Sequence, residues 1–226
     1  MAQLTDEESF NELFTDITAA DPLGFPEYQD KLLRSKERTG LNCAVLTGTA
    51  TVTGLPCALA VFDFFFIGGT LGGAEGEKLC RLFEHACDSQ LPIIVFLASG
   101  GMRMQEGLNS LMQMPKTVAT LGRVIERKLR YLVVFTDPSY GGATASFASV
   151  PYGLKIAEPR ARIGFAGPEV AKTIYPRDVE KLRHIQTPEA KIYPAEGMDT
   201  SQIDSIVPRA NLKHFIASFL SGKGTA

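Results

Sequence analysis

The stretch Ile93-Ile-Val-Phe-Leu-Ala-Ser-Gly-Gly101 runs from an unbroken apolar segment into a pair of glycines, and it sets the pattern of the fold. An apolar run of this length, rich in β-branched and aromatic residues and bounded by a turn signal, predicts a buried β-strand. The glycines predict a tight turn. A helix-like stretch follows, with Leu108, Leu111, Met112 and Met114 at helical spacing. The unit is therefore a strand, a glycine turn and a helix.

The same unit recurs along the chain. In chain order the other copies are residues 61–67 with Gly68-Gly69 and a helix to about residue 88, residues 131–135 with Gly141-Gly142 and a helix at 143–150, and a shorter copy at 163–165 with Gly167-Pro168. Strands that alternate with helices predict an α/β fold with mostly parallel pairing. Periodicity alone leaves open whether the sheet is doubly wound or a spiral of ββα units.

The flanking segments complete the expected organisation. Residues 5–8, Thr-Asp-Glu-Glu, have the spacing of a capping box and predict a short helix to about Phe14. The breaker cluster at 21–26 predicts a linker, so we expect residues 1–24 to be an N-terminal helix and linker, and 25–226 to be one domain. Further elements expected are a solvated helix at 27–38, a hairpin of residues 44–53 and 57–66, a strand at 205–207 and a helix from about 211 to 220.

Composition excludes several classes of function. The 226 residues carry a net charge of −2, so no basic field predicts binding to nucleic acid or to an anionic membrane. No apolar run reaches the roughly 20 residues that span a bilayer. The polar, acidic N-terminus predicts a cytoplasmic protein. None of the four cysteines forms a Cys-x-x-Cys pair, so we expect buried thiols and no bound metal.

The glycine turns do not fit the common nucleotide-binding motifs. The motif Gly-x-Gly-x-x-Gly would need glycine at position 70, which is Thr70 in this chain. A P-loop needs glycine directly followed by lysine, but Glu77 stands between Gly76 and Lys78. A glycine turn before a helix instead exposes backbone N–H groups that suit a developing oxyanion. A purely structural role for each turn stays open. A hydrolase triad also stays open because triads are spatial, although Ser99 and Ser146 lie outside any Gly-x-Ser-x-Gly motif.

Several motifs, in order and spacing, resemble the β-subunit family of acetyl-CoA carboxylase carboxyltransferases. The resemblance covers about residues 25 to 220, and its motifs are Phe66-Ile-Gly-Gly-Thr-Leu-Gly72, Ala98-Ser-Gly-Gly-Met-Arg-Met-Gln-Glu106, Leu108-Asn-Ser-Leu-Met-Gln-Met114, Thr136-Asp-Pro-Ser-Tyr-Gly-Gly-Ala-Thr-Ala-Ser-Phe147, and Ile156-Ala-Glu-Pro-Arg160 leading to Ile163-Gly-Phe-Ala-Gly-Pro168. Three features depart from the family. The region before Phe25 has no cysteine and so no four-cysteine zinc ribbon, residues 170–200 diverge, and Met102 stands where the family usually has a smaller residue.

The resemblance implies a crotonase-like spiral of ββα units. It implies transfer of a carboxyl group from carboxybiotin on a carrier protein to acetyl-CoA, giving malonyl-CoA for fatty-acid synthesis. The departures from the family point instead to a specialised relative that supplies malonyl-CoA for natural-product synthesis. The implied partners are a carboxyltransferase α subunit of the same fold, with the active site between the two subunits, the biotin carboxyl carrier protein and biotin carboxylase. The protein's task in this chemistry is to stabilise two oxyanions, orient the reactants and exclude water.

The site residues are carried over from the family's motifs. Gly141 and Gly142 are expected to form one oxyanion site, with Ala143 at the helix start. The other expected positions are Gly100 and Gly101 at a second oxyanion site, Gly68 and Gly69 on the CoA side, Arg103 on a phosphate or carboxylate, and Gly167 in the pocket wall. For Arg103 a structural ion pair is the alternative.

Two other functions remain as alternatives. The same oxyanion sites would serve a biotin-independent malonyl-thioester decarboxylase subunit, because decarboxylation also forms an enolate. A non-catalytic scaffold subunit is the third hypothesis. It predicts that the complex stays active when Gly141 and Gly142 are replaced by valine.

Overall fold

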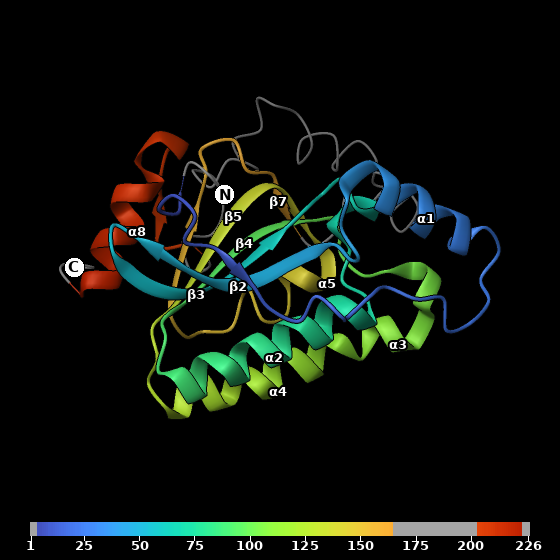
Figure 1. The fold of residues 1–226 in the computed structure, drawn as a ribbon, viewed down its shortest axis with the longest axis horizontal. Helices are drawn as coiled ribbons and strands as arrows, with labels where there is room; N and C mark the ends of the chain where they lie inside the picture. The colour runs from blue at the N-terminus through green and yellow to red at the C-terminus, as the bar shows by residue number, and fades with distance from the viewer. Residues whose placement is uncertain (1–3, 165–202, 223–226) are drawn as a thin grey trace, which may run out of the picture.

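One eight-stranded sheet forms the centre of the protein in a computed structural model, which describes residues 4–164 and 203–222 (Figure 1). The strand order is β1-β2-β3-β4-β5-β6-β8, and β7 also pairs with β5. The pairs β1–β2 and β2–β3 are antiparallel and the others are parallel, which confirms the predicted α/β class. The strands are β1 Asn11–Glu12, β2 Val45–Val52, β3 Leu55–Phe62, β4 Ile93–Ser99, β5 Tyr131–Tyr140, β6 Leu154–Ala157, β7 Ile163–Gly164 and β8 Ser205–Ile206.

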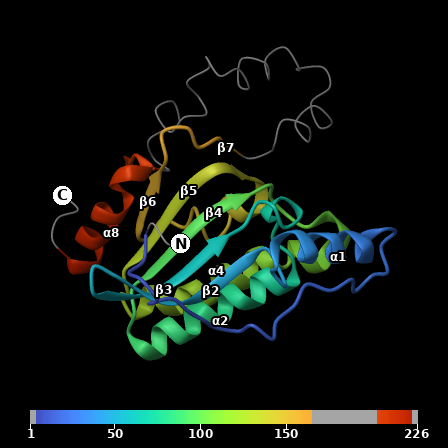
Figure 2. The same ribbon diagram turned by 45° about the horizontal axis from the view of Figure 1, so that its top comes forward.

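Helices cover both faces of this sheet. In both ribbon views α2 and α4 run side by side along one face, while α8 lies at the opposite end of the molecule from α1 and α3 (Figures 1 and 2). The helices are α1 Tyr28–Thr39, α2 Gly73–Ser89, α3 Gly107–Leu111, α4 Gln113–Glu126, α5 Gly141–Thr144 and α8 Leu212–Ser221, with short 3₁₀ turns η1 Ile67–Gly69, η2 Met104–Glu106 and η4 Arg209–Asn211.

The apolar strands are buried on both faces, as expected for parallel strands with helices on each side. Successive side chains point to opposite faces, so each strand supplies two cores. In β4, Ile93 and Val95 belong to the core under α2, whereas Ile94 and Phe96 pack in the core that contains Ile216 of α8. The continuous apolar run that predicted a buried strand therefore reflects two separate layers of packing.

The predicted hairpin and the helices α1, α2 and α8 are confirmed, but the helix after β4 differs from the prediction. The chain there divides into α3 and α4, and the side chains of Leu108 and Leu111 are 70% and 51% exposed. The residues that α4 buries include Thr117 and Leu121 instead. The apolar side chains of Leu108 and Leu111, whose spacing predicted a helix, thus lie on the surface. The helix expected at 143–150 is also shorter, because α5 ends at Thr144 and turns follow.

The helix predicted at residues 5–14 is wrong, because the structure has turns and the short strand β1 there. The carboxylate of Asp6 caps the β2–β3 turn instead of a helix. It accepts hydrogen bonds from Thr53 N–H at 2.9 Å and Gly54 N–H at 2.8 Å, and from the Thr51 hydroxyl at 2.8 Å. Contacts distant in sequence have overridden the local capping signal. The domain boundary at residue 25 stays a prediction.

All four cysteines are buried free thiols, as predicted. None of the helices within residues 4–164 and 203–222 has the length and apolar character needed to cross a bilayer.

Replacing Asp6 by Asn should lower the melting temperature at pH 7. The hydrogen bond from Gly54 N–H, followed by that from the Thr51 hydroxyl, holds the pKa of Asp6 well below its usual range. A depressed pKa stabilises the fold above the unfolded value of about 3.9, and this contribution is lost as the pH falls. The difference in melting temperature between wild type and variant should therefore shrink below about pH 4. A difference that is constant from pH 7 to pH 3 would show that the carboxylate charge plays no part.

Candidate active site

Three glycine turns meet at the carboxyl ends of β3, β4 and β5. These strands are adjacent and parallel, so the turns that follow them lie at one edge of the sheet. The Gly100 N–H donates a hydrogen bond to the Gly68 carbonyl oxygen at 2.7 Å. A Cβ atom built on Gly101 would lie 3.3 Å from the Gly141 Cα atom and 3.7 Å from the Gly142 nitrogen. The pairs that the sequence singled out are therefore brought into contact.

The close approach of these turns requires glycine at two positions. Gly101 has a φ of +113°, which side-chain-bearing residues rarely adopt. Gly69 has a φ of +61°, and a Cβ atom there would overlap the Ala98 carbonyl oxygen. Backbone packs directly on backbone here, so the surface that these turns form consists largely of peptide groups.

The N–H groups of the three turns are not equally available. Gly100 N–H is bonded to Gly68, and Gly101 N–H donates to the Ser99 hydroxyl oxygen at 3.1 Å. This differs from the expectation of a second oxyanion site at Gly100 and Gly101, since both donors are occupied within the protein. Gly141 and Gly142 begin α5, so their N–H groups have no acceptor within the helix. Both are partly exposed to solvent.

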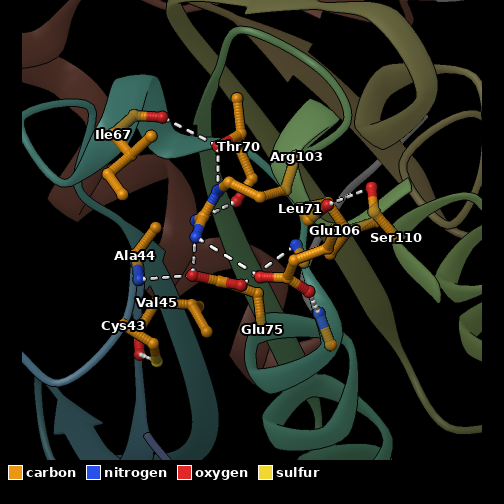
Figure 3. Close-up of polar contacts among 12 residues, drawn as sticks. Cys43, Ala44, Val45, Ile67, Thr70, Leu71, Glu75, Arg103, Glu106 and Ser110 are labelled. Carbon is orange, nitrogen blue, oxygen red and sulfur yellow. Dashed lines mark hydrogen bonds and ion pairs between the residues drawn. The ribbon is translucent and has the colours of Figure 1, made fainter. Parts of the chain in front are cut away.

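Arg103, two residues beyond Gly101, is fully buried. Figure 3 shows its guanidinium beside Glu75 and Thr70. One guanidinium nitrogen, Nη2, donates to Glu75 Oε1 at 2.7 Å and to the Thr70 carbonyl oxygen at 2.8 Å, and Nη1 donates to the Tyr28 hydroxyl oxygen at 2.9 Å. Burial alone opposes the charged form, but Glu75 offsets it, and the pKa of Arg103 is raised. The side chain therefore forms a structural ion pair, the alternative to the expected contact with a substrate phosphate.

Two carboxylates around Arg103 are held by the start of α2. Glu75 accepts hydrogen bonds from Gly72 N–H at 3.0 Å and from Ala44 N–H at 2.8 Å. Glu106 accepts from the Tyr28 hydroxyl and from Gly73 N–H, both at 2.7 Å. Negative charge is favourable at a helix N-terminus, where backbone N–H groups have no helical partner. Burial raises the pKa of Tyr28, so its hydroxyl stays protonated and donates to Glu106.

This cluster fixes the backbone of the glycine turns. Leu71 N–H donates to the Gly101 carbonyl oxygen at 2.8 Å, and Arg103 N–H donates to the Leu71 carbonyl oxygen at 2.9 Å. The segment after η1 and the segment after β4 are thereby clamped side by side. Since Arg103 also holds Thr70, its side chain ties the same two segments together from within the core.

A cavity of about 570 Å³ opens beside the turns. Gly68 and Gly100 line one wall, and α1 supplies three basic side chains, Lys31, Arg34 and Arg38. The sequence predicted α1 as a solvated helix and gave no sign that these cations face the site, because the helix packs there through tertiary contacts of Tyr28 and Leu32. Gly167 and His184 lie outside the described residues, and within the described part no cluster of acidic, histidine or cysteine side chains could hold a metal ion.

Comparison with known proteins decides the family. Residues 16–187 match the family described as "Carboxyl transferase domain". The chain is also 46% identical, over 97% of its length and 67% of the relative's, to the acetyl-coenzyme A carboxylase carboxyl transferase subunit beta of Microcystis aeruginosa (strain NIES-843 / IAM M-2473). The chain belongs to the carboxyl transferase domain family. This confirms the resemblance in the motifs and the assignment as an enzyme subunit.

Solved structures of more distant proteins share the fold. A transcarboxylase 12S structure superposes with a TM-score of 0.73 at 23% identity, covering 96% of this chain and 39% of that one. A Pseudomonas malonate decarboxylase hetero-tetramer gives 0.71 at 22% identity, covering 97% and 78%. These likenesses confirm the expected crotonase-like fold for this carboxyl transferase family member. At such identities they carry nothing about its substrate.

Replacing Arg103 by Met should destabilise this carboxyl transferase subunit by about 3–5 kcal/mol, the usual cost of leaving buried carboxylates without their partner. The matched control is Arg123→Met, because Arg123 pairs with Glu84 at 2.9 Å on the surface, with both side chains 47% exposed. That change should cost less than about 1 kcal/mol. Urea unfolding of both variants measures the difference. Equal stability of the two would contradict a structural role for the buried cluster.

Proposed function

We propose that this chain is the β-type subunit of an acetyl-CoA carboxylase carboxyltransferase. It would act in moving a carboxyl group from carboxybiotin on a carrier protein to acetyl-CoA, giving malonyl-CoA. The observation that carries the proposal is the meeting of three glycine turns beside a cavity lined with cations, in a chain 46% identical to a carboxyl transferase subunit beta. Biotin enters as a substrate on its carrier, and no resident metal is part of the proposal.

The proposed reaction needs little side-chain chemistry. The N–C bond of carboxybiotin breaks to release carbon dioxide, and its electron pair stays on the ureido group. That group takes a proton from the methyl carbon of acetyl-CoA, which becomes an enolate. The enolate carbon then bonds to carbon dioxide, giving malonyl-CoA and uncharged biotin. The protein stabilises negative charge on oxygen and holds the reactants together.

The described lining of the cavity suits this division of labour. It contains no carboxylate and no histidine that could serve as a general base. We place the oxyanion at the start of α5, where the N–H groups of Gly141 and Gly142 have no acceptor within the helix. Gly68, Gly69, Gly100 and Gly101 shape the surface against which the thioester would lie.

The basic residues of α1 suit the phosphates of coenzyme A. Lys31, Arg34 and Arg38 are spaced i, i+3 and i+7, so they share one face of the helix, and all three line the cavity. Lysine and arginine bind phosphate as point charges or as planar forks. The acyl thioester would then extend from these cations toward Gly68 and Gly100, which line the same cavity.

An α subunit is the partner that the surface favours. Exposed apolar side chains gather on the segment that follows the cavity wall, namely Met104, Leu108, Leu111 and Met112. Contiguous exposed apolar side chains mark a protein interface. We propose that an α subunit covers them and completes the active site, while biotin carboxylase loads the carrier elsewhere.

The two alternatives are less well supported. This chain is 20% and 22% identical in sequence to the two malonate decarboxylase structures. Similarity at that level bears on the fold alone. A scaffold role would give no reason for glycine turns packed backbone against backbone beside a cationic cavity.

The proposal predicts malonyl-CoA formation only from a complete mixture. The test combines this chain, an α subunit, enzymatically carboxylated carrier and acetyl-CoA, and omits each component in turn. Product should disappear with every omission, since two subunits and both substrates meet at the site. Loss of carbon dioxide from malonyl-CoA in the presence of avidin, without product in the complete mixture, would favour the decarboxylase instead.

Gly101→Ala should lower kcat for malonyl-CoA formation by about 10²-fold, toward the low end of the loss seen when an oxyanion donor is removed. The reason is steric, because the new Cβ would push on Gly141 and Gly142 and the backbone has a φ of +113°. Gly122→Ala is the matched control, since Gly122 lies in α4 with nothing within 4 Å of a Cβ atom. That variant should keep wild-type activity. Steady-state kinetics of the assembled complex compares them, and equal kcat values would contradict the placement of the oxyanion site.

A further inference from the structure

Met102 connects the cavity to the start of α5. Its side chain lines the cavity together with Gly68 and Gly100. The same side chain packs over Gly142, because a Cβ atom built on Gly142 would lie 2.7 Å from Met102 Cγ and still closer to its Sδ atom. A thioester that reaches Gly142 from the cavity therefore has to pass along this methionine.

A second methionine closes the other side. Met114 of α4 places its Sδ atom 2.8 Å from the same hypothetical Cβ position. Both methionines are partly exposed, so they border open space, and Met102 also packs against the main hydrophobic core. Together they form an apolar wall over Gly142, next to the N–H groups that would hold the oxyanion.

The backbone of Met102 is fixed while its side chain is adaptable. Leu71 is hydrogen-bonded to the residues on either side of Met102, Gly101 and Arg103, and Arg103 is locked into the buried charge cluster. The wall therefore cannot retreat by moving the chain. Only rotation of the methionine side chain can make room, because it has three flexible bonds.

We propose that Met102, supported by Met114, is the residue that limits the size of the acyl group. This inference rests on the proposed function and deepens it. In acetyl-CoA the carbon that is carboxylated is a methyl group, and in a longer acyl-CoA a further carbon extends from that atom. With the thioester oxygen at Gly142, the further carbon would meet Met102. Met102 is a specificity-determining residue and takes no part in proton transfer.

General principles give the expected preference of the complex for acetyl-CoA over propionyl-CoA. One methylene in an apolar pocket changes kcat/KM by about 10–200-fold. A rigid wall would give a change in kcat/KM in the upper part of that range. A methionine side chain can rotate away, so the change should lie in the lower part. The complete complex should thus prefer acetyl-CoA to propionyl-CoA by about tenfold or somewhat more.

The test measures kcat/KM for acetyl-CoA and propionyl-CoA with the complete complex, meaning this chain, its α subunit and carboxylated carrier. In Met102→Ala the ratio of propionyl-CoA to acetyl-CoA should rise by about tenfold or more. Met102→Val, which removes fewer atoms, should give a smaller rise, and it carries the test if the alanine variant fails to assemble.

Two controls separate size from loss of any methionine. Met102→Leu nearly conserves volume and should keep the ratio close to that of the wild type. Met104→Ala shortens another methionine that lines the cavity and is 80% exposed. The atoms nearest to a Cβ built on Gly142 belong to Met102 and Met114, so the Met104 variant should also keep the ratio.

The outcomes distinguish this inference from the proposed function. Malonyl-CoA formation by the wild type, with the same ratio in Met102→Ala and Met102→Val, would overturn the role of Met102 and leave the carboxyltransferase proposal intact. A wild-type complex that carboxylates neither acyl-CoA would overturn both. A rise in ratio in Met104→Ala equal to that in Met102→Ala would also overturn the inference, since the wall over Gly142 would then not be what selects.

Discussion

The buried guanidinium of Arg103 between Glu75 and Glu106 is the interaction on which the shape of the site depends. Removing charges from water is costly, and such a cluster survives only when every group is hydrogen-bonded. Here the partners come from the start of α1, the end of η1 and the start of α2. Each of these segments borders a glycine turn or the cavity. A charged cluster with such strict geometry allows these segments one relative arrangement, which an apolar core of similar volume would define less sharply.

The parallel sheet supplies the other half of the arrangement. Adjacent parallel strands end at one edge, so turns far apart in sequence become neighbours without any long-range side-chain signal. The result is a surface built from peptide groups. Such a surface can stabilise negative charge on oxygen without a titrating residue, which explains why the sequence shows no catalytic histidine or serine motif near these turns.

Much of the fold could be predicted from the sequence, because apolar runs, glycine pairs and helical spacing are local signals. The parts that could not be predicted are set by distant contacts. Asp6 satisfies a hairpin turn more than 40 residues away, which cancelled its apparent role as part of a helix start. Leu108 has helical spacing, but nothing in the described chain covers it. The family motif implied either a ligand contact or a structural ion pair for Arg103, and its position between two carboxylates shows that it forms the ion pair.

The proposed chemistry places negative charge on two oxygens, the enolate and the ureido oxygen, and each needs donors. Within the described residues, the N–H groups of Gly141 and Gly142 have no acceptor inside α5, whereas those of Gly100 and Gly101 are bonded internally. The second set of donors would then come from the partner subunit. The proposed division of one reaction between two chains would give a physical reason for the exposed apolar residues beside the cavity, because a partner subunit would cover that surface.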